Sequence, residues 1–357
     1  NASCRSRKKH DIRRRKRRMI LALGAFDGFH KGHQSLFESA SAVACERNEE
    51  WGVCTFSPHP GLVLFPAACR LLFDENEKLV LFRHLRIPNV VRISFDLALA
   101  ALDPQSFLRH LFSLGRISGL VVGENFHFGA GKTGDSKLLQ ELCERQGVLF
   151  RVLPRICIND RAVSSSAIRR LVHGGKLDEA REWLGYPYFL LGAVVRGNGR
   201  GRTLGYPTAN ISLPHWKILP PEGVYAAYAL IRGTPDVHLC ALSIGVNPTF
   251  DDVGERRIEA HILECDENFY GKEILVTPFK HLRGSVRFSG PDDLKIQIGS
   301  DIENISQFSA TKHDDNPYLA FVANLAEPFE MGAQNSPLGE SLVYDAISDS
   351  FVQWNPK

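Results

Sequence analysis

The chain has 357 residues, of which 44% are hydrophobic and 23% charged, and its formal net charge is +3. This composition is typical of a soluble globular protein with room for about two domains. No apolar run approaches the roughly 18 residues that a membrane span needs, no signal-peptide stretch opens the chain, and the eight cysteines form no C-x-x-C pair. We therefore expect a cytoplasmic protein without a zinc site or a disulfide framework.

Residues 1–18 are strongly basic. They carry ten Lys or Arg and one Asp, a local charge of +9 that leaves −6 for the remainder. Such runs bind phosphate backbones nonspecifically, which makes nucleic acid one candidate partner. Met19 stands directly before the first strand pattern, and we expect 1–18 to be a disordered extension.

Residues 19–186 alternate short apolar runs with helical patterns, which is typical of a parallel sheet with crossover helices. The expected strands are 20–24, 52–56, 90–94, 120–123 and 148–153, and the expected helices are 33–47, 104–114 and 136–146. The pattern predicts a Rossmann-like, doubly wound α/β domain.

Residues 187–308 change to strand after strand, separated by Gly, Pro and Asn. The expected strands are 188–195, 224–232, 237–245, 257–263 and 273–278, followed by a helix over 291–305. This succession predicts an antiparallel β-barrel with a C-terminal helix and a domain boundary near residue 187. The tail, 309–357, has seven acidic and two basic side chains and no clear periodicity, so we expect a poorly ordered or loosely docked extension.

The first candidate site is the segment GAFDGFHKGH at 24–33, a glycine turn between a strand and a helix. Such a turn offers backbone N–H groups and a helix N-terminus to a phosphate, and His30 and His33 can both face that anion. Two histidines near a turn are often ordinary surface residues, and the position after the first strand favours the functional reading. Farther on, VSSSAIRR at 163–170 places serines and Arg169 at a helix start, where they can serve as caps or grip a polyphosphate.

The second candidate site is RGNGRGRTLGYPTAN at 196–210, a loop rich in Gly and Arg. It suits a phosphate cradle, although an RNA-contacting loop or a simple hairpin has the same composition. Thr208 and Asn210 share one face of a strand and can offer oxygens to one Mg²⁺. Glu259 lies on a later strand pattern that can aim its carboxylate inward as a general base, although most strand glutamates are solvated.

Several segments occur in the order seen in one enzyme family. They are GAFDGFHKGHQ, TFSPHP, GENFHFGAGKTGD and SSSAIRR, and then GRGRTLGYPTAN, LPPEGVYAAY, IGVNPTF, IEAHIL, YGKEI and HLR. Over about residues 20–306 the chain resembles the bacterial bifunctional riboflavin kinase/FAD synthetases. The resemblance implies an FMN adenylyltransferase domain of the nucleotidyltransferase type and a six-stranded riboflavin kinase barrel, with ATP, riboflavin and FMN as substrates.

By this resemblance, His30 and His33 stabilise the transition state of adenylyl transfer from ATP to FMN. The residues implied in ATP binding there are Gly24, Phe26, Gly32, Ser164, Ser165 and Arg169. Asn125 and Phe128 are implied at the nucleotide and flavin pocket, with Phe56, Pro58 and His59 as weaker flavin-side candidates. In the kinase half, Thr208 and Asn210 bind Mg²⁺–ATP, Glu259 activates the ribityl hydroxyl, and Arg283 lies near the flavin. The loop residues implied beside the ATP phosphates are Gly199, Arg200, Gly201 and Arg202.

One position departs from the family pattern: Ala25 stands where Asn or Ser usually precedes FDG. This keeps open a riboflavin kinase whose N-terminal domain is inactive or altered. The basic run keeps open a flavin-sensing or RNA-binding protein on the same scaffold. The oligomeric state does not follow from the sequence.

Overall fold

The computed structural model describes residues 18–197, 200–247, 255–265, 267–308, 316–326, 342–345 and 350–353. These residues form two compact units. The first contains the chain up to Cys69, Leu85–Val163 and the two strands after residue 331, and the second contains Arg70–His84 and the chain from Ser164 to the end of α12. Except for Arg18, the expectation for residues 1–18 lies outside the described residues.

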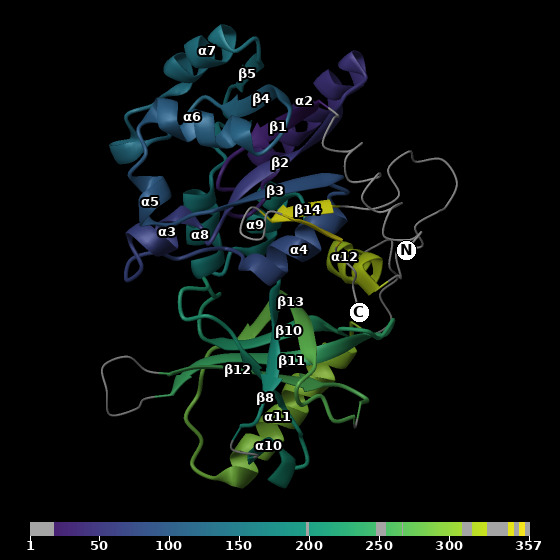
Figure 1. The fold of residues 1–357 in the computed structure, drawn as a ribbon. Coiled ribbons are helices and arrows are strands. Elements are labelled where there is room, and N and C mark those ends of the chain that lie inside the picture. The colour runs from purple at the N-terminus through teal and green to yellow at the C-terminus, as the bar shows by residue number, and fades with distance from the viewer. Residues whose placement is uncertain are drawn as a thin grey trace, which may run out of the picture. The chain divides into compact units, whose positions relative to one another are not determined.

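A seven-stranded sheet forms the centre of the first unit (Figure 1). In spatial order the strands are β15 (Ser350–Gln353), β14 (Leu342–Asp345), β3 (Asn89–Ser94), β2 (Glu50–Ser57), β1 (Met19–Leu23), β4 (Ile117–Gly123) and β5 (Leu149–Leu153). All neighbouring pairs are parallel except β14 and β15. The predicted parallel sheet is therefore confirmed, and two short strands from the tail extend it beside β3.

Helices cover both faces of this sheet. They are α2 (Lys31–Arg47), α6 (Pro104–Ser113) and α7 (Ser136–Arg145), with the short α3 (Pro60–Leu64), α5 (Leu97–Ala100) and η1 (Ala130–Lys132); β6 (Cys157–Ile158) and β7 (Arg161–Ala162) form a separate pair. Leu21 and Leu23 of β1 pack with apolar residues of α6 and α7, and the alternate residues Ile20 and Ala22 are equally buried. Burial on both faces is why the strand reads as an unbroken apolar run.

The second unit is built on a closed antiparallel barrel. Its strands, in spatial order, are β10 (Gly223–Ile231), β11 (Val237–Asn247), β12 (Glu255–Ile262), β9 (Ala209–Ser212), β8 (Leu190–Val195) and β13 (Glu273–Arg283). The expected six-stranded barrel is confirmed. The helices of this unit are α4 (Glu75–His84), α8 (Ser165–His173), α9 (Leu177–Leu184), α10 (Arg200–Thr203), α11 (Pro291–Ser306) and α12 (Pro317–Ala326).

A buried ion pair attaches α4 to the barrel unit. The Lys217 ammonium lies 2.7 Å from both carboxylate oxygens of Glu77, and both side chains are fully buried. Glu77 also accepts a hydrogen bond from the backbone N–H of Leu191 at the start of the barrel. Arg70–His84 therefore clusters with the barrel, although the sequence pattern groups it with the parallel sheet.

Helix α12 corrects the expectation of a poorly ordered or loosely docked tail for the segment 317–326. Its Tyr318, Phe321 and Val322 are buried. The Tyr318 hydroxyl donates a hydrogen bond to Asp178 of α9 at 2.8 Å, and the Phe321 ring stacks on Tyr186 with centroids 5.9 Å apart. This helix is part of the apolar core of the second unit. Within the described residues, no helix is both long enough and apolar enough to span a membrane.

Candidate active sites

The first candidate site lies where β1 and β4 end side by side. Ala22 of β1 is paired with Val121 of β4, so Gly24 and Gly123 leave the sheet together at its carboxyl edge. The chain runs from β1 to β2 on one side and enters β4 on the other, which makes this the topological switch point of the sheet. Ligands of doubly wound sheets bind in the crevice at that point.

His30 and His33 come together in the loop that follows β1. Their rings stack with centroids 3.6 Å apart and an interplanar angle of 18°. His30 is the N-cap residue of α2, where its carbonyl oxygen accepts hydrogen bonds from the N–H groups of His33 and Gln34. Burial lowers the pKa of His30 to about 4, so its imidazole is neutral near pH 7.

Two features of this loop suit an anion. The His30 Nδ1 atom is buried and has no hydrogen-bond partner in the described part of the chain. A side chain at Gly32 would place its Cβ 3.2 Å from that same atom, so glycine lets the ring lie against the first turn of α2. An unsatisfied buried polar atom is costly, and a phosphate oxygen bound there would satisfy it.

Buried aromatic side chains pack against the loop that carries His30 and His33. Phe26 and Phe29 are almost fully buried, with positive φ values of 47° and 38° that non-glycine residues rarely adopt. The Phe26 ring meets the rings of His33 and Phe37 edge-on, each at 5.1 Å. A Cβ at Gly24 would lie 2.9 Å from the Phe26 ring, which explains glycine there. Phe26 thus packs directly against His33, on whose ring His30 stacks.

Ala25 is anchored through its backbone. Its carbonyl oxygen accepts a hydrogen bond from the Thr55 hydroxyl at 3.3 Å, and its methyl group packs on the sheet core. Asn125 follows β4 at the same edge and is exposed, with its carbonyl oxygen in contact with His127 Nδ1. Phe128 is 6% exposed and packs against Phe107 and Phe126 in the core. A flavin contact for Phe128 stays a prediction.

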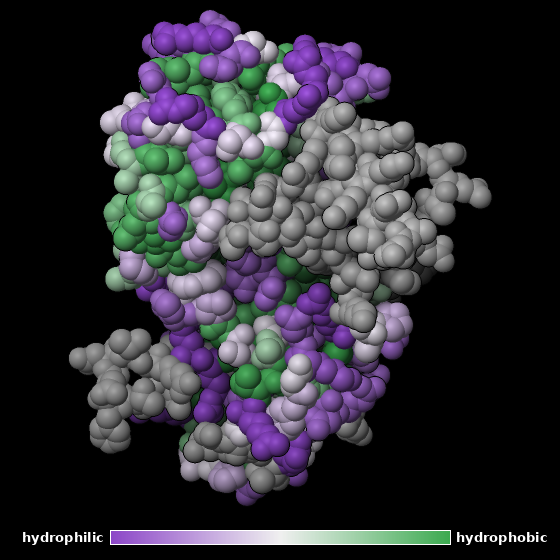
Figure 2. Space-filling view, viewed as in Figure 1, coloured by the Kyte–Doolittle hydropathy of each residue, from purple (hydrophilic) through white to green (hydrophobic). Residues whose placement is uncertain are grey.

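The segment after β2 also lies at the carboxyl edge. Phe56 is buried against Phe95, Pro58 is exposed, and His59 accepts a hydrogen bond from the N–H of Gly61 as the cap of α3. Beyond them Leu64, Phe65 and Leu97 are exposed, with Phe65 at 61% and Leu97 at 68%. Figure 2 shows this apolar surface over α3 and α5.

Ser164, Ser165 and Arg169 belong to the second unit. The Ser164 hydroxyl accepts a hydrogen bond from the N–H of Ala167 as the cap of α8, and the Arg169 guanidinium donates to Ser166. Their contribution to the phosphate site of the first unit stays a prediction.

The second candidate site lies on β9 and β12 of the barrel. Glu259 is paired directly with Asn210 across these antiparallel strands, and Ala260 is paired with Ala209. Thr208 and Asn210 are half-buried, whereas Ala209 between them is buried. Cross-strand partners are the closest side chains on one face of a sheet, so an amide and a carboxylate share this surface.

The structure corrects the expected inward direction of Glu259. Ile258 and Ala260 occupy the buried face of β12, so Glu259 lies on the other face with its side chain 26% exposed. There its carboxylate pairs with Arg257 at 3.4 Å. The predicted inward direction is wrong because the flanking apolar side chains of Ile258 and Ala260, and not the carboxylate, fill the barrel.

The backbone at two glycines lies very close to the predicted metal ligands. A Cβ at Gly197 would lie 2.3 to 2.5 Å from the Asn210 amide group, and a Cβ at Gly201 would lie 2.4 Å from the Tyr206 carbonyl oxygen and 3.2 Å from the Thr208 hydroxyl. Backbone thus closes around a hydroxyl and an amide oxygen, which are the hard donors that Mg²⁺ accepts alongside phosphate oxygens. Among the described residues no cluster of three His, Cys, Asp or Glu side chains could hold a metal instead. The residues present fit a divalent ion that is bound together with a nucleotide.

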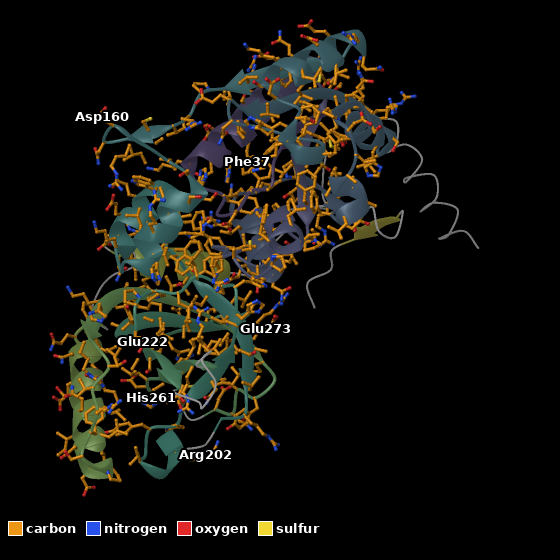
Figure 3. The ribbon with its side chains drawn as sticks, turned by 90° about the vertical axis from the view of Figure 1, so that its left-hand side faces the viewer. Phe37, Asp160, Arg202, Glu222, His261 and Glu273 are labelled. Carbon is orange, nitrogen blue, oxygen red and sulfur yellow. The ribbon has the colours of Figure 1, made fainter. Side chains whose placement is uncertain are left out.

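A pocket opens beside Thr208. It is lined by Val194, Arg202, Pro207, Thr208, Ala209, Ala260, Ile262, Cys265, Glu267, Asn268, Phe269 and Tyr270. Figure 3 shows Arg202 on α10 at one end of the barrel unit and His261 on the barrel. Gly201 and Arg202 are thus placed near Thr208, whereas Gly199 and the Arg200 side chain lie outside the described parts of the chain.

Arg283, the last residue of β13, forms an ion pair with Asp301 of α11. Its Nε donates to both carboxylate oxygens of Asp301 at 3.0 Å, and its Nη2 donates to one of them at 2.7 Å. Gln297 donates to the same carboxylate. Sequence reasoning missed Asp301, Arg257 and Gly197; only Gly197 carried a signal, as part of the glycine-rich run.

Comparisons with known proteins support both halves. A riboflavin kinase family model matches residues 184–309, and an FAD synthetase family model matches residues 12–167. The bifunctional riboflavin kinase/FMN adenylyltransferase of Listeria monocytogenes is 32% identical, covering 83% of this chain and 94% of the relative. Its counterpart in Escherichia coli K12 is 35% identical over 79% of this chain and 90% of the relative. A crystal structure from Streptococcus pneumoniae, described as a macrolide-efflux protein, is 28% identical with a TM-score of 0.71, covering 82% of this chain and 94% of that one.

Proposed function

Because the chain belongs to the bifunctional riboflavin kinase/FMN adenylyltransferase family, we propose that its barrel phosphorylates riboflavin and its parallel-sheet unit adenylylates the FMN. The observation that carries the kinase half is the pairing of Glu259 with Asn210, beside Thr208 and an open pocket. The stacked His30 and His33 at the switch point carry the other half.

In the kinase reaction, Glu259 removes the proton of the riboflavin 5′-hydroxyl as the oxygen attacks the γ-phosphorus of ATP. The bond between that phosphorus and the bridging oxygen breaks, and ADP leaves. Arg257, 3.4 Å from Glu259, holds the carboxylate on the face it shares with Asn210. A general base must lie within hydrogen-bond reach of the proton that it removes, so the position of this carboxylate is its first requirement.

Thr208 and Asn210 would hold the divalent ion, which we propose to be Mg²⁺, beside the ATP phosphates. When bound, the ion neutralises charge on the transferring phosphoryl group. Gly197 and Gly201 leave room for the nucleotide by keeping Cβ atoms away from the two ligands. Arg202, at the pocket lined by Thr208, adds a cation to the same phosphates.

In the adenylyl transfer, an oxygen of the FMN phosphate attacks the α-phosphorus of ATP and pyrophosphate leaves. His30 and His33 donate N–H groups to the phosphate oxygens that gain charge in the transition state. No covalent bond to the enzyme is needed. The exposed Leu64, Phe65 and Leu97 at the same carboxyl edge provide an apolar surface suited to the isoalloxazine ring.

Isotope transfer tests this proposal. Purified protein given riboflavin, Mg²⁺ and ATP labelled at the γ-phosphorus should produce labelled FMN and FAD. Among the flavins, ATP labelled at the α-phosphorus should label FAD but not FMN. Accumulation of FMN without FAD would instead support a kinase with an altered N-terminal domain, the alternative that Ala25 keeps open. Failure to form FMN would contradict the kinase assignment.

A further inference from the structure

His261 makes a hydrogen bond that links the two strands of the barrel site. Its Nδ1 atom lies 2.7 Å from the carbonyl oxygen of Pro207. A carbonyl oxygen only accepts, so Nδ1 carries the proton and donates it. The Pro207 carbonyl carbon is bonded directly to the nitrogen of Thr208, and its position therefore constrains the Thr208 backbone.

The hydrogen bond from His261 to Pro207 connects β12 to the chain before β9, just beyond the last backbone pair of the two strands. The pairing of β12 with β9 comprises Glu259 with Asn210 and Ala260 with Ala209. Pro207 has no N–H group to continue a ladder. The side chain of His261, the next residue of β12, extends the connection to the residue before Thr208.

The same histidine also supports the glycine-rich loop. The Tyr206 ring meets the His261 ring edge-on, with centroids 5.6 Å apart. The N–H of Tyr206 donates to the carbonyl oxygen of Gly201 at 2.8 Å. His261 thus contacts the two residues before Thr208: it makes an aromatic edge contact with Tyr206 and a hydrogen bond with Pro207.

We propose that His261 is a positioning residue for the metal–nucleotide site: it holds the Pro207 carbonyl so that the Thr208 hydroxyl faces the bound ion. The inference rests on the proposed kinase function. It assigns His261 no contact with either substrate. Removal of its Nδ1 donor should weaken Mg²⁺–ATP binding and leave riboflavin binding unchanged.

Three substitutions separate the donor from the ring. His261→Asn places an amide N–H close to the position of Nδ1, His261→Gln moves that group about one bond farther, and His261→Phe keeps an aromatic ring without a donor. The matched control is His238→Phe on β11, a half-buried barrel histidine outside the site. Near-ultraviolet circular dichroism of each full-length variant verifies folding.

The kinase assay compares the KM for Mg²⁺–ATP with the KM for riboflavin. His261→Phe and His261→Gln should raise the KM for Mg²⁺–ATP about three- to tenfold, the size expected for one lost hydrogen bond. The KM for riboflavin should stay within about twofold, and His261→Asn and His238→Phe should resemble the wild type. Equal ATP constants in all variants would overturn the proposal, as would a loss in His261→Asn equal to that in His261→Gln.

Alkylation of Cys265 gives a readout that does not depend on turnover. Cys265 lines the pocket beside Thr208, so bound Mg²⁺–ATP should slow its reaction with iodoacetamide, measured by peptide mass spectrometry. The ATP concentration that gives half protection should rise in His261→Phe and His261→Gln by the same factor as the KM. Unchanged half protection in these variants contradicts the role of His261. An absence of protection in the wild-type protein contradicts the proposed ATP pocket itself.

Discussion

At the scale of single residues, burial sets the protonation state of His30. The side chain is 5% exposed, and burial lowers its pKa to about 4. The free protein therefore holds a neutral imidazole with a buried, unsatisfied Nδ1 at a helix N-terminus. A phosphate oxygen bound there would supply the missing partner, which is why we propose this atom as part of the adenylyl-transfer site.

This burial predicts a pH dependence of stability. An unfolded histidine has a pKa near 6.5, so between roughly pH 6.5 and 4 the unfolded chain binds a proton that the folded chain does not. The free energy of unfolding should therefore fall as the pH falls through this window, by about 2 kcal/mol from pH 7 to pH 5. Urea unfolding of the wild type and His30→Gln measures it, and the variant should lose about 2 kcal/mol less. Equal losses in the two proteins would rule out this explanation.

Residue types and spacing singled out Thr208, Asn210 and Glu259, and the structure places Glu259 directly across from Asn210, but the predicted direction of Glu259 was wrong. Strand alternation has only two phases, and Ile258 and Ala260 occupy the buried one. Asp301 could not be found from sequence, because its link to Arg283 joins residues 18 positions apart on a strand and a helix. Such pairs become visible only once the packing of the two elements is known.

At the scale of elements, sequence reasoning missed α4, α9, α10 and α12 in the barrel unit, and α4 shows one physical reason. Six of the ten residues of α4, ENEKLVLFRH, are charged or polar, a composition typical of a solvated helix. Its Glu77 and Lys78 are nevertheless buried, and Glu77 is neutralised by Lys217, about 140 residues away. Burial raises the pKa of Glu77 to about 7, and the Lys217 ammonium opposes that rise.

The buried pair predicts a large asymmetry between substitutions. Glu77→Gln leaves the Lys217 ammonium without a counter-charge and should cost about 3–5 kcal/mol of the free energy of unfolding. The matched change at an exposed position of α11, Glu303→Gln, should stay within about 0.5 kcal/mol. Denaturant unfolding monitored by near-ultraviolet circular dichroism compares the two. A cost below about 1 kcal/mol for Glu77→Gln would show that the pair does not anchor α4.

At the scale of the whole molecule, one compact unit contains the seven-stranded sheet and the other contains the closed barrel. Alternating strands and helices predicted the parallel sheet, and successive strands predicted the barrel; both are confirmed. The grouping of Arg70–His84 with the barrel, and of two tail strands with the sheet, joins segments that are distant in sequence. Local periodicity carries no information on such pairings, which depend on long-range burial.

We propose that each of the two compact units performs one of the two reactions. The most direct measurement is the chromatographic product profile of His30→Ala and Glu259→Gln, each given Mg²⁺ and ATP with either riboflavin or FMN. His30→Ala should form FMN from riboflavin but no FAD from either substrate. Glu259→Gln should leave riboflavin unchanged and convert supplied FMN to FAD at the wild-type rate. Loss of both reactions in either folded variant would contradict the division of labour between the two units.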